Sequence, residues 1–524
     1  MCAACTRNHI LCDWTERKLS NAESVTLEYV SSPNPSQRSR AFSVSSNASL
    51  EVQSPSSEVG GNLILITGQY VANLNLAAYG VKSSREADLL RHAVQNIFPT
   101  LISIYADPGF RQPETWIASS SQPRPLKEAL LALSSLHVSK KGASQDPMAL
   151  GYYSSSVQDL RRQVGYRSMT GSEDHLLMNV VWFYIFEIWG LRLDHLVGAA
   201  THLKGALQIL KLRQSSNVGI QNGIPNAMDR LCAESVLYNL GNMAFFDKSL
   251  CLLPISKVRD VLGPLLAEPS FPNASSIANA PVLGVPAAEM YFLVLEVSQL
   301  SHCTPFSDKD RARGTEILEI LEKLRMYPDN SPFATPTDIH TQLMYEAAYL
   351  YVLAAKTLLF LLLNPNTSHT HCTIQGYASQ AMSILRTGVM GQPCKQFFCW
   401  PLLILSSVLE LLEDISFMHH ELQAAWRISS CGNVLVVLQV FETLTQRRLA
   451  GERVNTIDYL GILQGKSTPS IFDSIQDRII ENSYHEFSHS LQVSTACWFS
   501  VSPPNHASAK SCAFICASLL SEHT

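Results

Sequence analysis

Apolar residues recur at intervals of three and four along most of the chain beyond residue 84, which is the spacing of one face of an α-helix. One stripe follows Ser84, which is suited to cap a helix N-terminus, and ends at Pro99. Another follows Pro125, a residue favoured in the first turn of a helix. The two stripes consist of Ala87, Leu90, Val94, Ile97 and Phe98, and of Leu126, Leu130, Leu133 and Leu136. Both predict helices with one buried face.

Two stretches are too apolar for the surface of a soluble domain. Residues 176–189 are apolar nearly all round, which is typical of a helix enclosed by other helices. Residues 347–363 form the longest apolar stretch, but Lys356 lies inside it. The stretch also falls short of the roughly 18–20 uninterrupted apolar residues that a membrane span needs. We therefore expect a buried core helix there, and no membrane partner.

Helical patterns continue to near the C-terminus. A further stripe consists of Leu196, Ala199, Leu203, Ala206 and Leu210. Later helices are expected at residues 287–300, 315–326, 338–363, 377–387, 401–415, 422–448 and 474–486. Strand signals are scarce, and the short apolar patch at residues 61–71 is read either as a strand or as a segment docked on the main domain. The pattern predicts an all-α fold.

Composition divides the chain into four regions. Residues 1–18 are rich in cysteine and locally basic, and residues 19–62 are rich in Ser, Pro and Asn, which favours a disordered linker. Residues 63–495 are expected to form one large multi-helix domain, because apolar residues make up 46% of the chain and charged residues only 16%. Residues 496–524 are expected to form a flexible tail.

The net charge of -5 gives the chain no overall attraction to nucleic acid or to anionic lipid. Any DNA binding must therefore come from a small local module. The start of the chain lacks the apolar segment of a secretory signal, so its 13 cysteines are expected to be reduced, in the cytosol or nucleus.

The first twelve residues contain a metal-like cysteine spacing. Cys2, Cys5 and Cys12 are separated by two and then six residues, so a short turn followed by a loop can direct three thiolates at one zinc ion. The alternative is that three cysteines near a terminus are incidental. The basic residues around them are candidates for DNA-backbone contacts, namely Arg7, Arg17 and Lys18.

This spacing, followed by Asp13-Trp14, resembles the second half of the fungal zinc binuclear cluster. In that family six cysteines hold two zinc ions, so the resemblance implies that Cys2, Cys5 and Cys12 are three of the six ligands. The first half of the motif, with its basic DNA-reading helix, does not precede them. Three sulfurs cannot complete two tetrahedral sites, and even one zinc needs His9, water or a partner as fourth ligand. We expect that the chain begins at an internal Met, through an incomplete gene model or a truncation.

A second resemblance covers most of residues 85–460 and concerns the fungal-specific transcription factor domain, a helical regulatory region. The matching segments are Leu89-Leu90-Arg91-His92, Phe98-Pro99, residues 125–137, Tyr152-Tyr153, Leu160-Arg161, Phe186-Glu187, Trp189-Gly190, His202-Leu203-Lys204-Gly205-Ala206 and Trp400-Pro401-Leu402-Leu403. Ile404-Leu405-Ser406 departs from the small Ala-Gly step expected after the Trp-Pro segment. The order and spacing of these segments carry the resemblance.

Physically, the matching residues are interpreted as packing residues rather than as catalytic ones. Gly205-Ala206 is expected to let two helices approach closely, and Glu187 is expected to need a buried partner. His137 and His202 are interpreted as hydrogen-bonded core histidines rather than as metal ligands. The domain is expected to serve ligand sensing or co-regulator contact, and the pattern locates no ligand pocket.

A competing motif lies near the C-terminus. His485-Glu486-Phe487-Ser488-His489 matches H-E-x-x-H, in which two histidines on one helix face bind zinc and the glutamate polarises a water molecule. Gln492 stands where the extended motif has Gly, and the only downstream candidates for a third ligand are His506, His523 and Glu522. A zinc metallohydrolase is therefore kept as an alternative.

The favoured interpretation is a fungal zinc-cluster regulator of RNA polymerase II transcription, located in the nucleus and not an enzyme. The resemblance implies promoter DNA as a partner if the zinc cluster is completed upstream, and a homodimer or co-regulator proteins as further partners. Genes of secondary metabolism or nutrient use are the expected targets. The alternative within this class is a truncated regulator that acts through protein contacts without binding DNA by itself.

Overall fold

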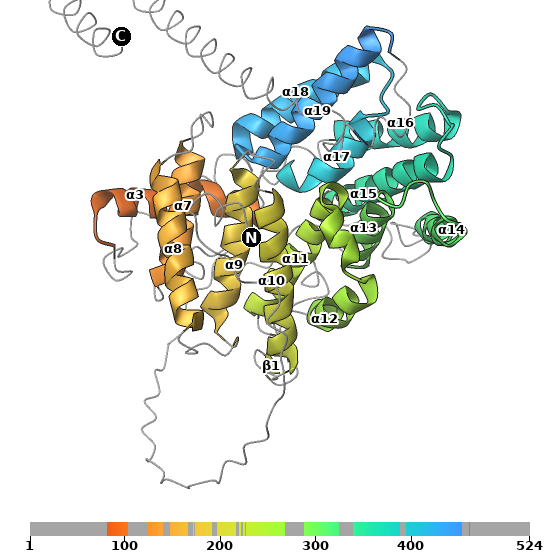
Figure 1. The fold of residues 1–524 in the computed structure, drawn as a ribbon. Coiled ribbons are helices and arrows are strands. Elements are labelled where there is room, and N and C mark those ends of the chain that lie inside the picture. The colour runs from red at the N-terminus through yellow and green to blue at the C-terminus, as the bar shows by residue number, and fades with distance from the viewer. Residues whose placement is uncertain are drawn as a thin grey trace, which may run out of the picture.

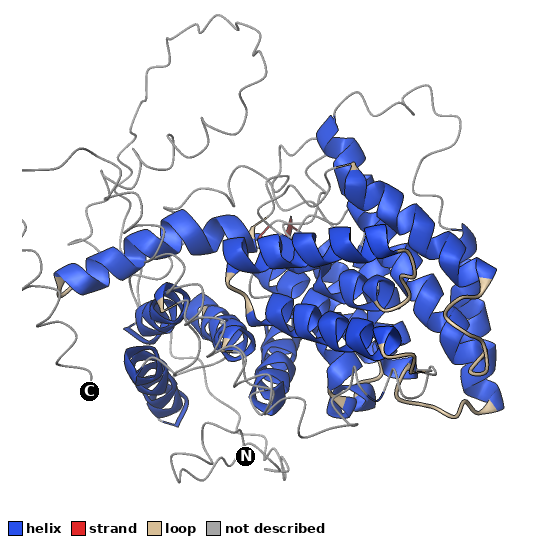
Figure 2. Ribbon diagram, turned by 90° about the horizontal axis from the view of Figure 1, so that it is seen from above, coloured by secondary structure: helices blue, strands red, loops and turns tan. Residues whose placement is uncertain are grey.

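The structure is a computed structural model, and it describes residues 81–102, 124–139, 147–165, 171, 173–190, 196–215, 220–221, 224–225, 227–267, 288–323, 339–387, 395–452 and 461. Helices make up nearly all of this part of the chain (Figures 1 and 2). The two described strands, β1 (Ile220–Gln221) and β2 (Ile224–Pro225), pair antiparallel over two residues each. The all-α prediction is confirmed.

The first helices stand beside one another at one end of the array in Figure 1. They are α3 (Ser84–His92), the π-helical turn η2 (Ala93–Ile97), α4 (Phe98–Leu101), α7 (Arg124–Val138) and α8 (Pro147–Gly165). Ser83, not Ser84, caps α3, because its hydroxyl accepts a hydrogen bond from the Glu86 N–H at 3.2 Å. The helical path does not end at Pro99, because that residue lies in the first turn of α4, where a missing N–H costs no helical bond.

Helix α9 (Asp174–Trp189) lies at the centre of the fold, and every residue from 176 to 189 is buried. It contacts α7, α10 (Leu196–Ser215), α11 (Ala227–Phe246) and the late helix α19 (Gly432–Leu449). These neighbours leave no face of α9 for water, as its all-round apolar sequence predicts.

The second half of the array follows through a series of shorter helices and one long helix. They are η4 (Lys248–Leu252), α12 (Ile255–Ala267), α13 (Ala288–Leu300), α14 (Asp308–Lys323), α15 (Ile339–Leu363), α16 (Cys372–Arg386), η7 (Lys395–Phe398), α17 (Cys399–Ser406), α18 (Leu412–Ser429) and α19. In Figure 1 α18 and α19 run side by side along one edge of the molecule.

Several predicted boundaries are wrong. The helix expected at 401–415 is two helices, because α17 ends at Ser406 and α18 begins at Leu412. The helix expected at 422–448 is likewise divided at Ser430, which adopts a left-handed conformation with φ of 48°. The periodicity did not predict α8, α11 or α12, and α14 begins earlier than expected. The helix expected at 474–486 lies outside the described residues, and the four domain bounds stay predictions.

The apolar helix α15 is a core helix. Its segment Glu346–Leu363 is the one described stretch that is long and apolar enough to cross a membrane, and 83% of that segment is buried inside the fold. Lys356 lies 3.0 Å from Glu322 on α14, and its ammonium group sits over the Tyr377 ring. A buried cation with these partners suits a protein interior, which confirms the predicted core helix.

A buried polar cluster joins α8, α9 and α10. The Tyr153 hydroxyl donates to Glu187 Oε1 at 2.7 Å, which gives Glu187 the buried partner that its sequence position predicted. The same hydroxyl oxygen lies 3.1 Å from Nε2 of His202. Because Tyr153 gives its single proton to Glu187, the His202 N–H is the donor in that second bond. His202 is half-buried, and this bond confirms the prediction of a hydrogen-bonded histidine.

The close helix approach lies at Gly198 rather than at Gly205. A Cβ at Gly205 would meet Val180 at 3.8 Å, an ordinary contact, whereas a Cβ at Gly198 would meet the Glu187 carboxylate at 3.2–3.4 Å. The prediction for Gly205 is therefore wrong in position, because the motif identifies the helix but not the residue that faces the tightest contact.

Gly198→Ala is expected to lower the free energy of unfolding by about 1–3 kcal/mol, because the added methyl group displaces the Glu187 carboxylate from its bond with Tyr153. Urea unfolding monitored by circular dichroism measures the change. Gly205→Ala is the matched control, since alanine has room there and favours the helix by about 1 kcal/mol. Equal effects of the two substitutions would contradict the assignment of the close helix approach to Gly198.

The free energy of unfolding is expected to fall as the pH drops below about 6.5, which is the ordinary pKa of histidine. Burial lowers the pKa of His202, against the opposing attraction of Glu187, so the unfolded chain takes up a proton at a higher pH than the folded protein does. Burial also lowers the pKa of His175 and His369. Urea unfolding at several pH values between 7.5 and 5 measures this decrease. The free energy of unfolding should fall less with pH in His202→Gln than in the wild type. An identical pH dependence would count against this explanation.

Candidate ligand pocket

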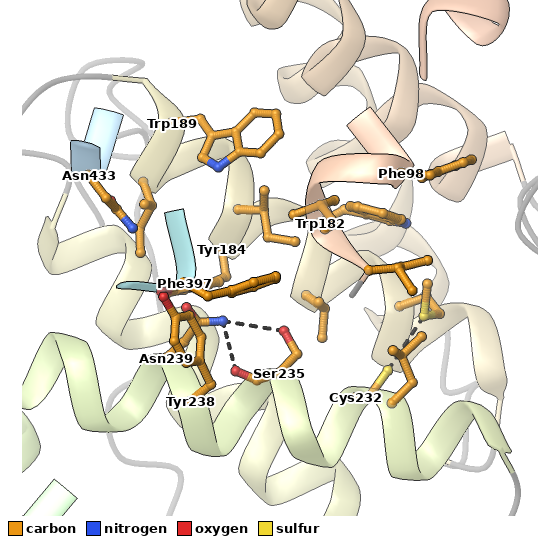
Figure 3. A pocket seen from close by; sticks show the side chains of 17 residues that line it. Phe98, Trp182, Tyr184, Trp189, Cys232, Ser235, Tyr238, Asn239, Phe397 and Asn433 are labelled. Atoms are coloured by element: carbon orange, nitrogen blue, oxygen red, sulfur yellow. Dashed lines mark hydrogen bonds between the residues drawn. The ribbon is translucent and has the colours of Figure 1, made fainter. Parts of the chain in front are cut away.

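A pocket lies between α9 and α11, with an empty volume of about 760 Å³ that includes open solvent at its mouth. Residues of α4, η7 and α19 complete its walls. Figure 3 shows its side chains from close by. They are Phe98, Leu101, Ile102, Met178, Val181, Trp182, Tyr184, Ile185, Ile188, Trp189, Leu231, Cys232, Ser235, Tyr238, Asn239, Phe397 and Asn433.

Aromatic rings supply much of the wall. Trp182 comes from the middle of α9, Trp189 is the last residue of that helix, and Phe98 comes from the start of α4 (Figure 3). The Phe98 and Trp182 rings pack with their centroids 6.0 Å apart. Phe397 enters from η7 and packs edge-on against Tyr238 of α11. Because α9 is apolar on every side, even its face toward the pocket carries large hydrophobic groups.

A few polar groups interrupt this apolar surface. The Tyr184 side chain is only 2% exposed, and its hydroxyl oxygen has no hydrogen-bond partner in the described part of the protein. Burial raises the pKa of Tyr184 well above its ordinary value, so the hydroxyl keeps its proton and can donate it. On the α11 side, the Asn239 amide donates to the Ser235 carbonyl oxygen at 2.7 Å (Figure 3).

Among the described residues that line the pocket there is no Asp, Glu, Lys, Arg or His. The one thiol in this described lining, that of Cys232, donates a hydrogen bond to the Met178 sulfur at 3.4 Å. Burial, reinforced by the charge of Asp229, raises the pKa of Cys232, so this thiol stays protonated and is a poor nucleophile. The pocket is therefore suited to noncovalent binding of an uncharged molecule rather than to catalysis.

A second, smaller cavity shares Ile188 and Asn433 with the first. Its empty volume is about 500 Å³, and its other lining residues are Asn242, Met243, Phe246, Cys399, Trp400, Leu403, Val436 and Val437. Trp400 is 2% exposed, stacks on Tyr351, and has no hydrogen-bond partner for Nε1 within the described residues. Asn433 thus marks the boundary between two neighbouring cavities.

A buried ion cluster holds the helices that form the pocket. Arg213 of α10 is 1% exposed and pairs with Asp229 of α11 and with Asp174 of α9, at 2.8 and 2.6 Å. Burial raises the pKa of Asp229, and the hydrogen bond from Arg213 opposes that shift. The three charges join α9, α10 and α11 at one point, which fixes the register of the two helices that face the pocket.

The other core histidine that the sequence singled out lies outside the pocket. His137 Nδ1 is 2.8 Å from Nε2 of His92, and its own Nε2 is 3.0 Å from the Ser429 carbonyl oxygen. The ring also packs 5.4 Å from that of Trp189. These contacts confirm His137 as a hydrogen-bonded core residue.

The predicted metal sites lie outside the described residues. These sites comprise Cys2, Cys5 and Cys12 with Arg7, Arg17 and Lys18, and the competing motif His485, Glu486 and His489. Among the residues that the structure does describe, no group of three or more His, Cys, Asp or Glu side chains is placed to hold a metal ion. The pocket was not predicted, because its lining is drawn from five separate elements and resembles core sequence in each.

The chain was also compared with known proteins. Residues 88–471 match the model of the fungal specific transcription factor domain. No curated protein and no solved structure shows significant similarity to the chain. The matched range contains nearly all of the described helices, from α3 to α19, and both cavities. Because the match covers well over half of the chain, the protein belongs to the fungal-specific transcription factor domain family, whose members are transcription regulators.

Proposed function

We propose that the protein regulates RNA polymerase II transcription in the nucleus, with the helical domain as its regulatory part and the N-terminal cysteine region as part of its DNA-binding module. The observation that carries the proposal is the family match over residues 88–471 downstream of the Cys2, Cys5 and Cys12 spacing. The two features stand in the order that a zinc-cluster regulator requires. Genes of secondary metabolism or nutrient use are the proposed targets.

Zinc is the proposed cofactor of the N-terminal region. Thiolates are preferred zinc ligands, and structural zinc sites are tetrahedral with four protein ligands. Cys2, Cys5 and Cys12 supply three sulfurs, so promoter binding requires additional ligands from outside this set. A homodimer, or a complex with co-regulator proteins, is the proposed assembly on DNA.

The electrostatics of the chain support a local DNA contact. The net charge of -5 means that the protein as a whole is repelled by the phosphate backbone. Arg7, Arg17 and Lys18 concentrate positive charge next to the cysteines, where phosphate contacts would position the module. Binding through so few cations depends on a structured metal site to hold them together.

A regulatory role also fits the chemistry of the described domain. Buried Arg213 pairs with Asp229, buried Glu187 accepts a hydrogen bond from Tyr153, and the buried cysteines Cys232 and Cys399 of the two cavities have raised pKa values. Such groups stabilise a fold and are not activated for proton or group transfer. The second candidate, a zinc hydrolase, depends on His485 and His489 and is separated from the proposal by the zinc measurement below.

Purified full-length protein is expected to contain zinc that depends on the N-terminal thiols. Cys5→Ser removes one thiolate ligand and should lower the zinc content by at least half, measured by inductively coupled plasma mass spectrometry. His485→Ala is the matched control and should leave the zinc content unchanged. The reverse pattern, zinc lost in His485→Ala and retained in Cys5→Ser, would favour the hydrolase instead.

The epitope-tagged protein, expressed in a fungal host, is expected to be enriched at a limited set of promoters in chromatin immunoprecipitation. Cys5→Ser should reduce this enrichment to background, because the metal site that holds the basic residues is lost. Gly205→Ala, which alters only an uncrowded position on α10, serves as the control. Enrichment that persists in Cys5→Ser would point to recruitment through protein contacts alone.

A further inference from the structure

We infer that the pocket between α9 and α11 binds a neutral, mainly aromatic small molecule that accepts a hydrogen bond from Tyr184. This inference goes beyond the proposed function, since it concerns a ligand site in the helical domain and stands whether or not the N-terminal region binds zinc. It rests on three properties of the pocket, which are its aromatic walls, its unsatisfied hydroxyl group and the uncharged side chains of its described lining.

The walls favour a flat, apolar occupant. Phe98, Trp182, Trp189 and Phe397 present aromatic rings from three different elements, and aliphatic side chains of α9 fill the spaces between them (Figure 3). An aromatic molecule in such a site gains binding free energy from the burial of its apolar surface. It also gains from offset or edge-on contacts with the aromatic rings of the wall. A concave apolar site with a few polar groups is the usual form of a small-molecule site.

The Tyr184 hydroxyl supplies the polar contact. An O–H group that is buried without a partner destabilises a fold by about 1–3 kcal/mol, so native proteins rarely leave one unpaired. Tyr184 is 2% exposed, lines the pocket and has no partner among the described residues. A hydroxyl or carbonyl oxygen of a bound molecule would satisfy it.

The described lining carries no charged side chain, which disfavours ionic ligands. A carboxylate or an ammonium group would lose its hydration on entering the pocket and find no counter-charge among the lining residues. Cys232, the one thiol among the described lining residues, stays protonated and already donates to Met178, so it does not attack the ligand. Binding is therefore noncovalent and selects neutral molecules.

The position of the pocket gives binding a structural consequence. Its walls join α4 and α9 from the first half of the domain to η7 and α19 from the second half. Phe397 and Asn433 approach the occupant from the second half, while Trp182 and Tyr184 hold it from the first. A ligand that contacts both halves favours the arrangement in which they are packed together.

Titration of the full-length protein with 2-naphthol tests the inference. This probe is a neutral two-ring molecule with one hydroxyl group, and 2-naphthoate is its charged counterpart at pH 7. Isothermal titration calorimetry should detect saturable binding of 2-naphthol and at least about tenfold weaker binding of 2-naphthoate. Tyr184→Phe should weaken 2-naphthol binding by about 5- to 10-fold.

Two further variants distinguish a pocket effect from a general loss of stability. Tyr291→Phe makes the same change at another buried tyrosine that does not line the pocket, and it should leave the affinity unchanged. Ser235→Leu places a larger side chain at the pocket wall and should reduce the affinity at least about tenfold, with the helical circular dichroism spectrum retained.

Three results would overturn the inference. The first is that 2-naphthol shows no saturable binding to the wild type. The second is that 2-naphthoate binds as tightly as 2-naphthol. The third is that Tyr184→Phe and Ser235→Leu, both folded, bind 2-naphthol like Tyr291→Phe. None of these outcomes depends on zinc content or promoter occupancy, so the failure of one proposal is distinguishable from the failure of the other.

Discussion

The burial of α9 from Leu176 to Trp189 is the constraint on which the rest of the structure depends. A helical segment that is buried all round must be covered on every side, and α7, α10, α11 and α19 provide that cover. Every polar group on it must then find a partner inside the protein. Glu187 finds Tyr153, whereas Tyr184 faces a cavity. The polar cluster at Glu187 and the pocket at Tyr184 both arise because α9 carries polar groups inside the protein.

Ion pairs between α9, α10 and α11 help to set how these helices are arranged. The buried guanidinium of Arg213 meets carboxylates from α9 and α11, so the observed placement of the three helices compensates the buried charges of Arg213 and Asp229. Hydrophobic contacts alone tolerate sliding and rotation, whereas an ion pair at under 3 Å does not. The cluster thus gives directional contacts to a core that is otherwise held by non-directional ones.

The sequence predicted the fold class and the buried helices α9 and α15, because uninterrupted apolar runs have one simple explanation. It failed for α11, since Asp229, Arg230 and Glu234 are buried there and break the apolar pattern that marks a helix. It also failed at Ser430, because the residue in the left-handed conformation there is not a glycine. The pocket had no local signal, because Trp182 and Tyr184 look like core residues until the facing elements are placed. The two residues form a site only together with those facing elements, and the sequence alone does not bring them together.

The link from His137 to Ser429 joins parts of the chain that are 292 positions apart. His92 reaches the same imidazole from α3, so the earliest described helix and the C-terminal end of α18 share one hydrogen-bonded ring. The helical array is thereby closed on itself rather than extended like a stack of independent repeats. Removal of α3 or of α18 would therefore take a hydrogen-bond partner from the same buried imidazole, so neither helix is independent of the other.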